Sequence, residues 1–305
     1  MENYKLPLFS IVIANYNYGR FLDDAIKSVL TQSCLDFELI ICDAASTDNS
    51  VEVIKKYANG LPPNTSYDEW LSKNNSQLPT STPQLITWWC SEKDGGQSAA
   101  FNKGFSHARG RFLTWLNADD ILFPDALAAI EKETRRHPET EWFIGSSMYV
   151  DRDLRITRCF RCHRFSRLRA RFGFLSVGGP SSFFTKRLLD SVGGIDENLH
   201  FLMDIDLWYK FVRNRHKTYK RTCSYVFAYR IHEDSKMSGA DVEKSEKALS
   251  NRAKAQKEFE LLQCRYGIPG RSIVRLVTIV TLSILDKVLS IIDTSINKRR
   301  ICFHA

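Results

Sequence analysis

The chain has 305 residues, of which 43% are hydrophobic and 26% are charged. A chain of this length and apolar content can bury a core in one large domain or two small ones, which excludes disordered and collagen-like proteins. Lys and Arg outnumber Asp and Glu by 43 to 35, and the net charge of +8 favours an anionic partner such as a nucleotide, a nucleic acid, an anionic lipid or a phosphate.

Apolar residues in the first half alternate between short continuous runs and helical spacing. We expect strands, buried on both faces of a sheet, at 8–14, 37–42, 85–90, 111–116 and 142–150. We expect helices from Phe21, over 51–57, over 97–108 and from Pro124, which we place at the first helical position. Residues 59–83, rich in Asn, Ser, Thr and Pro, predict a surface insertion. This β-α alternation is typical of an α/β sheet with right-handed crossovers.

The second half is less regular. We expect helices over 207–212, over about 242–265 and, as an amphipathic helix, over 272–296. The last of these packs on the preceding domain or a second subunit, or it lies in the membrane interface, which its basic flanks favour. Residues 152–171 carry eight arginines against one acid. They form a solvated face or contact an anionic membrane or lipid-diphosphate acceptor, and no nucleic-acid motif accompanies them.

The N-terminal segment has no basic start or long apolar run, and the sequence has no stretch of 18 uncharged apolar residues. We therefore expect no signal peptide, no spanning helix and a cytoplasmic location, with peripheral attachment to the cytoplasmic face of the membrane as the alternative. The eight cysteines have no short repeated spacing, so free thiols are expected. Cys159–His163 fits a haem-attachment pattern, but that chemistry needs an exported protein, and a zinc site would need a second pair.

Three of the first four predicted strands are followed by turns that carry carboxylates. In open α/β sheets, ligands bind at the carboxyl ends of the strands. The most informative turn is Asn117-Ala118-Asp119-Asp120, whose oxygen-rich side chains suit Mg²⁺ or Mn²⁺ bound together with a diphosphate. The alternative is a strand-to-helix turn in which an Asp caps the next helix.

Six segments occur in the order that one enzyme family shows. They are Ser10–Asn17, Ile41–Asp48, Ser91–Gly96 with Asn102–Gly104, Trp115–Asp120, Met203–Trp208 and Arg230–His232. From about Leu8 to Ser238, the sequence resembles the family 2 glycosyltransferases. It is similar to the branch with S-E-x-D-x-G, N-K-G, W-L-N-S-D-D and M-D-x-D-L-W motifs.

The resemblance implies a GT-A fold, an α/β architecture with a mostly parallel central sheet flanked by helices. It implies a catalytic domain over residues 1–240 and a helical tail over 241–305. The implied activity is inverting transfer of a sugar from a nucleotide-sugar donor, such as a UDP-sugar, to a glycan or lipid-linked acceptor in cell-surface polysaccharide synthesis. Mn²⁺ or Mg²⁺ would assist. Contact with an anionic membrane and a homo-oligomer stay open, and no nucleic acid is expected.

The resemblance also implies roles for single residues. Asp119 would hold the metal, and His232 would contact metal or diphosphate unless its role is structural. Asp204 is the candidate general base and Asp206 the alternative; two residues apart at a helix start, they should not point the same way. The residues implied to contact the nucleotide sugar are Ala14, Tyr16, Asp43, Lys93, Asn102 and Asn117.

The sequence departs from the family pattern at three places. Ala14 replaces a Pro, Ala44-Ala45 replaces Asp-Gly, and Asn117 replaces the first Asp of the metal motif. The segment 178–184 resembles an acceptor-side loop, or it is a turn before a buried strand. A non-catalytic nucleotide-sugar-binding or scaffold protein of the same fold is the main alternative. A sugar-phosphate nucleotidyltransferase fits less well, because the first turn lacks its Gly-rich, Arg-containing loop.

Overall fold

The structure, a computed structural model, describes residues 6–66, 69, 86–162, 170, 177–214, 219–233, 235 and 246–269. The strands are β1 (Phe9–Asn15), β2 (Phe37–Asp43), β3 (Ile86–Ser91), β4 (Phe112–Asn117), β5 (Ile121–Leu122), β6 (Trp142–Val150), β7 (Ile156–Phe160), β8 (Ser182–Thr185) and β9 (Tyr219–Arg230). The helices are α1 (Gly19–Leu30), α2 (Ser50–Ala58), α4 (Gln97–His107), α5 (Ala126–Arg136), α7 (Lys186–Asp190), α8 (Met203–Arg213) and α10 (Glu246–Tyr266), and a 3-10 turn, η1, spans Gly179–Ser181.

The described strands form one nine-stranded sheet in the order β3-β2-β1-β4-β8-β6-β9-β5, with β7 paired to β6. Around β1 the sheet is parallel: β1 lies between β2 and β4, and β3 continues beyond β2. The carboxyl end of β1 is therefore a point where the strand order reverses. The other half is mixed, since β8 is antiparallel to both β4 and β6 whereas β6 and β9 are parallel. The predicted α/β class is confirmed.

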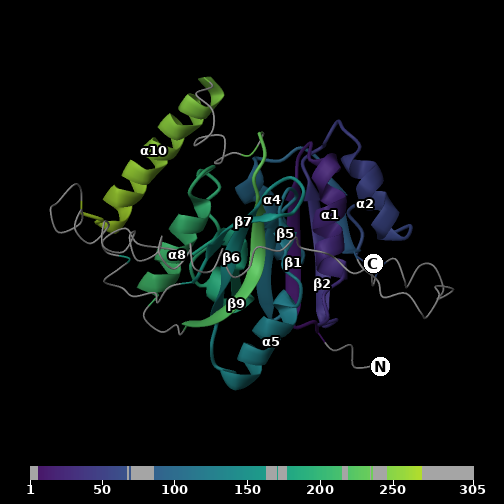
Figure 1. The fold of residues 1–305 in the computed structure, drawn as a ribbon, viewed down its shortest axis with the longest axis horizontal. Helices are drawn as coiled ribbons and strands as arrows, with labels where there is room; N and C mark the ends of the chain where they lie inside the picture. Colours follow the sequence, from purple (N-terminus) through teal and green to yellow (C-terminus); the bar gives the residue numbers. More distant parts are fainter. Residues whose placement is uncertain are drawn as a thin grey trace.

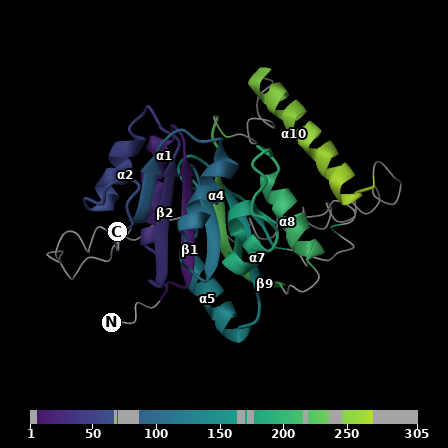
Figure 2. The same cartoon turned by 180° about the vertical axis from the view of Figure 1, so that it is seen from behind.

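The side chains of β1 alternate between two cores, one on each face of the sheet. Phe9, Ile11 and Ile13 belong to the core shared with α1, α2 and α5, whereas Val12 belongs to the core under α4 and α8. All four side chains are fully buried. The views from opposite sides show these helices covering the two faces (Figures 1 and 2). Burial on both faces is the reason that the strand has a continuous apolar run.

Three tryptophans fix α8 against the sheet. Trp208 stacks between Trp115 of β4 and Trp142 of β6, with ring centroids 5.5 and 5.3 Å apart and interplanar angles of 7° and 20°. Aromatic pairs at such separations contribute about 0.5–1.5 kcal/mol each beyond the area they bury. The stack holds the helix whose first turn carries Asp204 and Asp206.

The helix α10 lies beside α8 at one edge of the molecule (Figures 1 and 2). Leu262, Tyr266 and Ile268 are buried in the same core as α8. The α10 part of the predicted tail therefore packs on the sheet domain. In the described ranges, no helix has both the length and the apolar character that crossing a bilayer requires.

The predicted strands and helices before residue 120 are present within two residues of the expected bounds. The predicted helix start at Pro124 is wrong: α5 begins at Ala126, because Asp125 takes a left-handed backbone (φ 59) that interrupts the helix. The strand β9 was not predicted. The described residues do not include the predicted helix over 272–296, the domain boundary at 240, or much of the 59–83 and 152–171 segments.

Candidate active site

Polar residues end four neighbouring strands at one edge of the sheet. Asn15 of β1 is in register with Asp43 of β2, and Asp43 is in register with Ser91 of β3. On the other side of β1, Asn117 of β4 is in register with Ala14. Because the strands are parallel, all of these residues meet at the carboxyl edge, where the strand order reverses.

The carboxylate of Asp43 is buried, and the chain itself supplies its hydrogen bonds. Oδ1 accepts from Asn15 Nδ2 (2.6 Å) and from the hydroxyl of Ser46. Oδ2 accepts from the backbone N–H of Ser46 (3.0 Å) and from Ser91 Oγ (2.6 Å). By contrast, Asn15 Oδ1 is buried with no hydrogen-bond partner among the described residues. A buried acceptor left unpaired costs about 1–3 kcal/mol, which a ligand donor would recover.

Three other residues predicted to contact the nucleotide sugar surround this edge. Ala14 is partly buried, Tyr16 is 59% exposed just after β1, and Lys93 is exposed in the loop after β3. The exposed Tyr16 ring offers an aromatic face at the residue that follows Asn15 in the chain. The edge thus combines a planar apolar group, a cation and an acceptor, which a nucleotide can use.

Side chains of the turn after β4 hydrogen-bond to one another and to residues of neighbouring elements. Asn117 Nδ2 donates to Asp120 Oδ2 (2.7 Å), and Asp120 Oδ1 accepts the backbone N–H of Arg230 (3.0 Å). Gln97 Nε2 donates to Asn117 Oδ1 (2.6 Å). Burial, with the adjacent charge of Asp119, holds the pKa of Asp120 well above its usual value. Asp120 is therefore part of the turn's framework, and Asp119 is the carboxylate of the motif that reaches solvent.

Asp119 meets His232, which follows β9. His232 Nε2 lies 3.1 Å from Asp119 Oδ2; the imidazole is buried, whereas the side chain of Asp119 is 17% exposed. The imidazole packs on the rings of Phe21 and Tyr18, with centroids 4.5 and 5.7 Å away. The two rings hold the imidazole so that Nε2 faces the carboxylate.

Arg230 places His232 in this position. Its side chain is buried, and Nη2 donates to Asp24 Oδ2 on α1 (2.9 Å). The guanidinium lies 4.9 Å from the centroid of the Phe21 ring, a cation–π contact. The Arg230–His232 segment therefore fastens the end of β9 to α1.

The donors of Asp119 and His232 are chemically suited to Mn²⁺ or Mg²⁺. Both ions accept carboxylate oxygen, Mn²⁺ also accepts imidazole nitrogen, and Mg²⁺ keeps positions for water and substrate phosphates. Across the part of the chain that the structure describes, no three His, Cys, Asp or Glu side chains gather as a metal site. Two protein donors fit an ion that binds together with a diphosphate.

Asp204 lies in the first turn of α8. Its Oδ1 accepts the backbone N–H of Ile205 (2.8 Å), and burial nevertheless raises its pKa to about 6. Burial and the charges of Asp204 and Asp120 raise the pKa of Tyr229, so the phenol of this β9 residue has both carboxyls in its surroundings. The phenol oxygen accepts the backbone N–H of Gly179 (3.2 Å). A carboxyl with a pKa near neutrality suits proton transfer.

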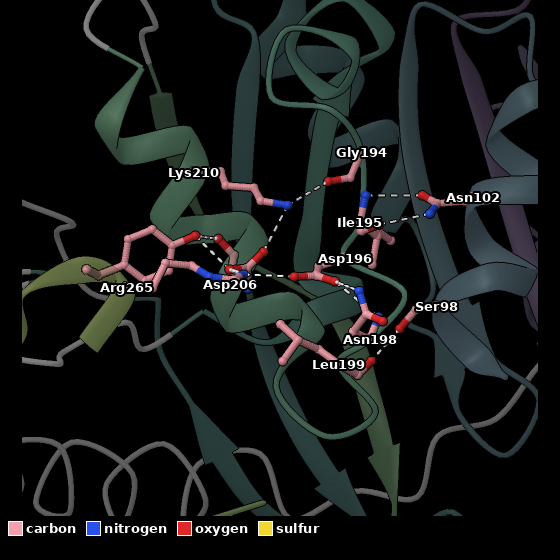
Figure 3. Close-up of polar contacts among 11 residues, drawn as sticks. Ser98, Asn102, Gly194, Ile195, Asp196, Asn198, Leu199, Asp206, Lys210 and Arg265 are labelled. Atoms are coloured by element: carbon pink, nitrogen blue, oxygen red, sulfur yellow. Dashed lines mark hydrogen bonds and ion pairs between the residues drawn. The ribbon is translucent and has the colours of Figure 1, made fainter. Parts of the chain in front are cut away.

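Asp206 has different neighbours. It is fully buried, forms ion pairs with Arg265 (2.7 Å) and Lys210 (2.9 Å), and accepts the hydroxyl of Tyr266 (2.6 Å; Figure 3). Residues two apart on a helix do not share a face. The structure therefore separates the two carboxylates: Asp204 neighbours Tyr229, whereas Asp206 anchors α10.

Asn102 is engaged with the loop before α8. Nδ2 donates to the carbonyl of Ile195 (2.9 Å) and to Glu197 Oε1 (2.8 Å), and Oδ1 accepts the backbone N–H of Ile195 (3.1 Å; Figure 3). The amide thus joins α4 to this loop. Gln97 and Tyr229 were not selected from the sequence, because no local spacing marks a side chain whose partners lie on other strands.

Residues 10–185 match the family model described as glycosyl transferase family 2. The chondroitin synthase of Pasteurella multocida is 27% identical over 208 residues, which are 68% of this chain and 19% of that protein. The chain therefore spans about a fifth of that relative's length.

Two solved structures share the fold. The crystal structure of S. aureus TarS 1-349 in complex with UDP gives a TM-score of 0.53 at 18% identity, covering 77% of this chain and 62% of that one. The mannosyltransferase PcManGT from Pyrobaculum calidifontis, in complex with GDP-Man and Mn²⁺, gives 0.52 at 15% identity, covering 92% and 81%. These similarities confirm the predicted GT-A fold.

Proposed function

Because the chain belongs to glycosyl transferase family 2 and is a glycosyltransferase with a GT-A fold, we propose that it transfers a sugar, with inversion, from a nucleotide-sugar donor to a glycan or lipid-linked acceptor. A UDP-sugar is the favoured donor, supported by the UDP bound to TarS. The named chondroitin synthase supports a role in cell-surface polysaccharide synthesis.

The nucleotide binds at the carboxyl edge of β1, β2 and β4. Asn15 Oδ1 accepts a base N–H, Tyr16 covers the base, and Asp43 holds Asn15 and Ser91 in place. Asn117 offers hydrogen bonds to the ribose, and Lys93 neutralises phosphate charge.

Asp119 and His232 would hold Mn²⁺ or Mg²⁺ at the donor diphosphate. When bound, the ion neutralises the charge that develops on the leaving nucleoside diphosphate. His232 is kept in place by Phe21 and Arg230, so Asp119 needs little reorganisation to share a ligand with it.

Asp204 acts as the general base. The acceptor hydroxyl gives its proton to the Asp204 carboxylate while its oxygen bonds to the anomeric carbon, and the bond from that carbon to the diphosphate oxygen breaks. The transition state has oxocarbenium character, as in glycoside hydrolysis. A carboxylate with a pKa of about 6 is ionised at pH 7 and still takes a proton in the transition state.

One observation carries this proposal: burial and the charges of both Asp204 and Asp120 raise the pKa of Tyr229, and Asp119 is the residue next to Asp120. The base candidate Asp204 and the turn that carries the metal candidate Asp119 therefore share the Tyr229 phenol as a neighbour, although their elements are far apart in the chain. Such an arrangement suits a base acting at the sugar end of a donor whose diphosphate is at Asp119.

The test is a thermal-shift panel of UDP, GDP, CMP and dTDP, each with and without Mn²⁺. A ligand that binds only the native state raises the unfolding midpoint. We expect one nucleotide to raise it, more so with Mn²⁺, and the Asp119→Ala variant to lose the Mn²⁺ increment. No response to any nucleotide would contradict the donor site. Donor binding without turnover on any acceptor would favour a non-catalytic nucleotide-sugar-binding protein.

We also propose that transfer takes place at the cytoplasmic face of a membrane, supported by the net charge of +8 and the basic segment 152–171. Flotation with vesicles of phosphatidylglycerol, compared with vesicles of phosphatidylcholine alone, tests this. Binding to neither would contradict it.

A further inference from the structure

Three consecutive backbone N–H groups lead into α8 and bind one side chain of α10. Glu258 Oε1 accepts from His200 (2.8 Å), and Oε2 accepts from Phe201 and Leu202 (each 2.9 Å). A helix leaves the first N–H groups of its N-terminus without partners inside the helix. No side chain caps α8 at its N-cap residue, Leu202. Glu258 therefore fixes, from another helix, the backbone that enters α8, and the N–H of Leu202 is the one of these three that belongs to the end of the helix itself.

A second contact follows further along α10. Arg265 Nη1 donates to Asp206 Oδ1 (2.7 Å) and to Asp196 Oδ2 (2.8 Å), and the Tyr266 hydroxyl donates to Asp206 Oδ1 (2.6 Å; Figure 3). Glu258 and Arg265 are about two helical turns apart. The helix α10 thus holds the entry to α8 and its first turn at two points, both through charge-assisted bonds.

The same loop is held from the opposite side by α4. Ser98 Oγ donates to the carbonyl of Leu199 (2.7 Å), and Asn102 binds both backbone groups of Ile195 (Figure 3). The loop from Ile195 to Leu202 therefore lies between α4 and α10. It cannot shift without breaking bonds to one of them.

Asp204 lies between the two contact points, Leu202 and Asp206. In the described part of the chain, no ion pair of Asp204 is seen, and its carboxylate accepts backbone N–H groups of its own helix turn, those of Ile205 and of Asp204 itself. Its position therefore follows from the backbone of the first turn of α8. The titratable group near Asp204 is the Tyr229 phenol of β9, whose own pKa is also raised by the charge of Asp120 after β4.

We propose that α10 is a positioning element of the transferase, in which Glu258 and Arg265 are positioning residues that hold Asp204 in place for proton transfer. The inference rests on the base role given to Asp204 above. The helix has an apolar anchor of its own, since Leu262 is fully buried in the core. Glu258 instead directs both oxygens at the three residues that precede the helix of the base.

The test compares Glu258→Gln with Glu260→Gln in the full chain. Gln keeps the size of Glu258 but turns one acceptor into a donor, which would face N–H groups. Glu260 is exposed on the same helix and pairs with Gln256 (2.9 Å), so it is the matched control. Two readouts are used: the pKa of the Asp204 carboxyl by ¹³C NMR, and the rate of UDP release from UDP-GlcNAc with Mn²⁺, water acting as acceptor.

We expect Glu258→Gln to lower the pKa of Asp204 from about 6 towards its ordinary value, because a loosened first turn exposes the carboxyl. We expect kcat to fall at least about tenfold while KM for the donor changes less than about twofold, since the donor site lies on other elements. Glu260→Gln should match the unaltered chain in both readouts.

A folded Glu258→Gln chain with unchanged Asp204 pKa and unchanged kcat would overturn the proposal, even if its melting temperature fell. If Glu258→Gln does not fold, Tyr266→Phe, which removes the hydroxyl bond to Asp206, decides by the same readouts. Full activity in Asp204→Asn would instead contradict the base role. The NMR readout needs no donor, so the two failures are distinguishable.

Discussion

The imidazole of His232 lies 3.1 Å from the carboxylate of Asp119, although the two residues are 113 positions apart in the chain. The parallel strand β4 delivers one partner, and β9 delivers the other. The partly exposed carboxylate of Asp119 and the buried nitrogen of His232 meet here, and together they would offer an oxygen and a nitrogen ligand to an ion bound with a diphosphate.

Replacing Asp119 by Asn should remove the anionic ligand without changing the size of the side chain. We expect transfer to fall by about a hundredfold or more, because one charged metal ligand and its charge neutralisation are lost. Donor-dependent turnover over a Mn²⁺ titration measures this. Asp125→Asn is the control, since Asp125 is exposed and, among the hydrogen bonds described, its side chain bonds to Ser33. Equal Mn²⁺ dependence in both variants would refute the metal role of Asp119.

Replacing Asp204 by Asn should separate activity from stability. The pKa of Asp204 is about 6 in the folded chain and 3.8 ordinarily, so the folded state holds the proton more tightly. That stabilisation is fully present below about pH 4 and is lost as the pH rises through 6. At pH 8 the ionised carboxyl therefore costs the fold at most about 3 kcal/mol. Asp204→Asn should melt higher at pH 8 and lose at least about a hundredfold in turnover.

The pH profile of the unaltered enzyme follows from the same pKa. The base must be ionised, so kcat should fall about tenfold for each pH unit below 6 and level off above it. Steady-state rates from pH 4.5 to 8 in about half-unit steps would show the break. A flat profile across this range would argue against Asp204 as the base.

Replacing Glu38 by Ala should destabilise the fold and leave nucleotide binding by the folded molecules unchanged. Glu38, 2% exposed, accepts from Ser10 Oγ (2.6 Å), from the backbone N–H (2.6 Å) and Nε (2.9 Å) of Arg109, and from the N–H of Gly110 (3.2 Å). Its removal leaves buried donors unpaired, and we expect a loss of about 3 kcal/mol in the free energy of unfolding. Urea unfolding measures it.

The control for Glu38→Ala is Glu52→Ala on the exposed face of α2, which should change stability by less than about 0.5 kcal/mol. Glu38 lies at the opposite end of β2 from Asp43, so nucleotide binding per folded molecule should be unchanged. Loss of binding in folded Glu38→Ala would contradict this separation.

Replacing Gly104 by Ala tests the packing of α4 on β1. A Cβ at Gly104 would lie 2.2 Å from Val12 Cγ1, so the helix or the strand must shift. We expect a net loss of about 1–3 kcal/mol, despite the better helix propensity of Ala. The double variant Gly104→Ala with Val12→Ala should lose less free energy of unfolding than the two single variants lose in sum, because Val12→Ala makes room for the new Cβ. Simple additivity in thermal or urea unfolding would rule out this contact as the cause.

The alternation of strands and helices, and the residues that end β1, β2 and β4, can be predicted from the amino-acid pattern alone. These features are local: a strand buried on both faces needs a continuous apolar run, and its end needs a turn, so pattern and spacing carry the information. The ordered motifs also placed the chain in its family. The sequence could likewise predict that Asp204 and Asp206 point in different directions, because helical spacing alone decides this.

The contacts of those side chains, by contrast, follow from how the elements pack together. The Asp43 carboxylate accepts hydrogen bonds from Asn15, Ser46 and Ser91. These partners are set largely by the register between strands, which cannot be seen in any single segment of the sequence. That Asp206 anchors α10 and Glu258 binds the segment entering α8 depends on partners more than 50 positions away in the chain. Hydrogen bonds form between groups that the fold brings within about 3 Å, whatever their separation in sequence. Local periodicity therefore fixes the elements, and packing between elements assigns each polar residue its role.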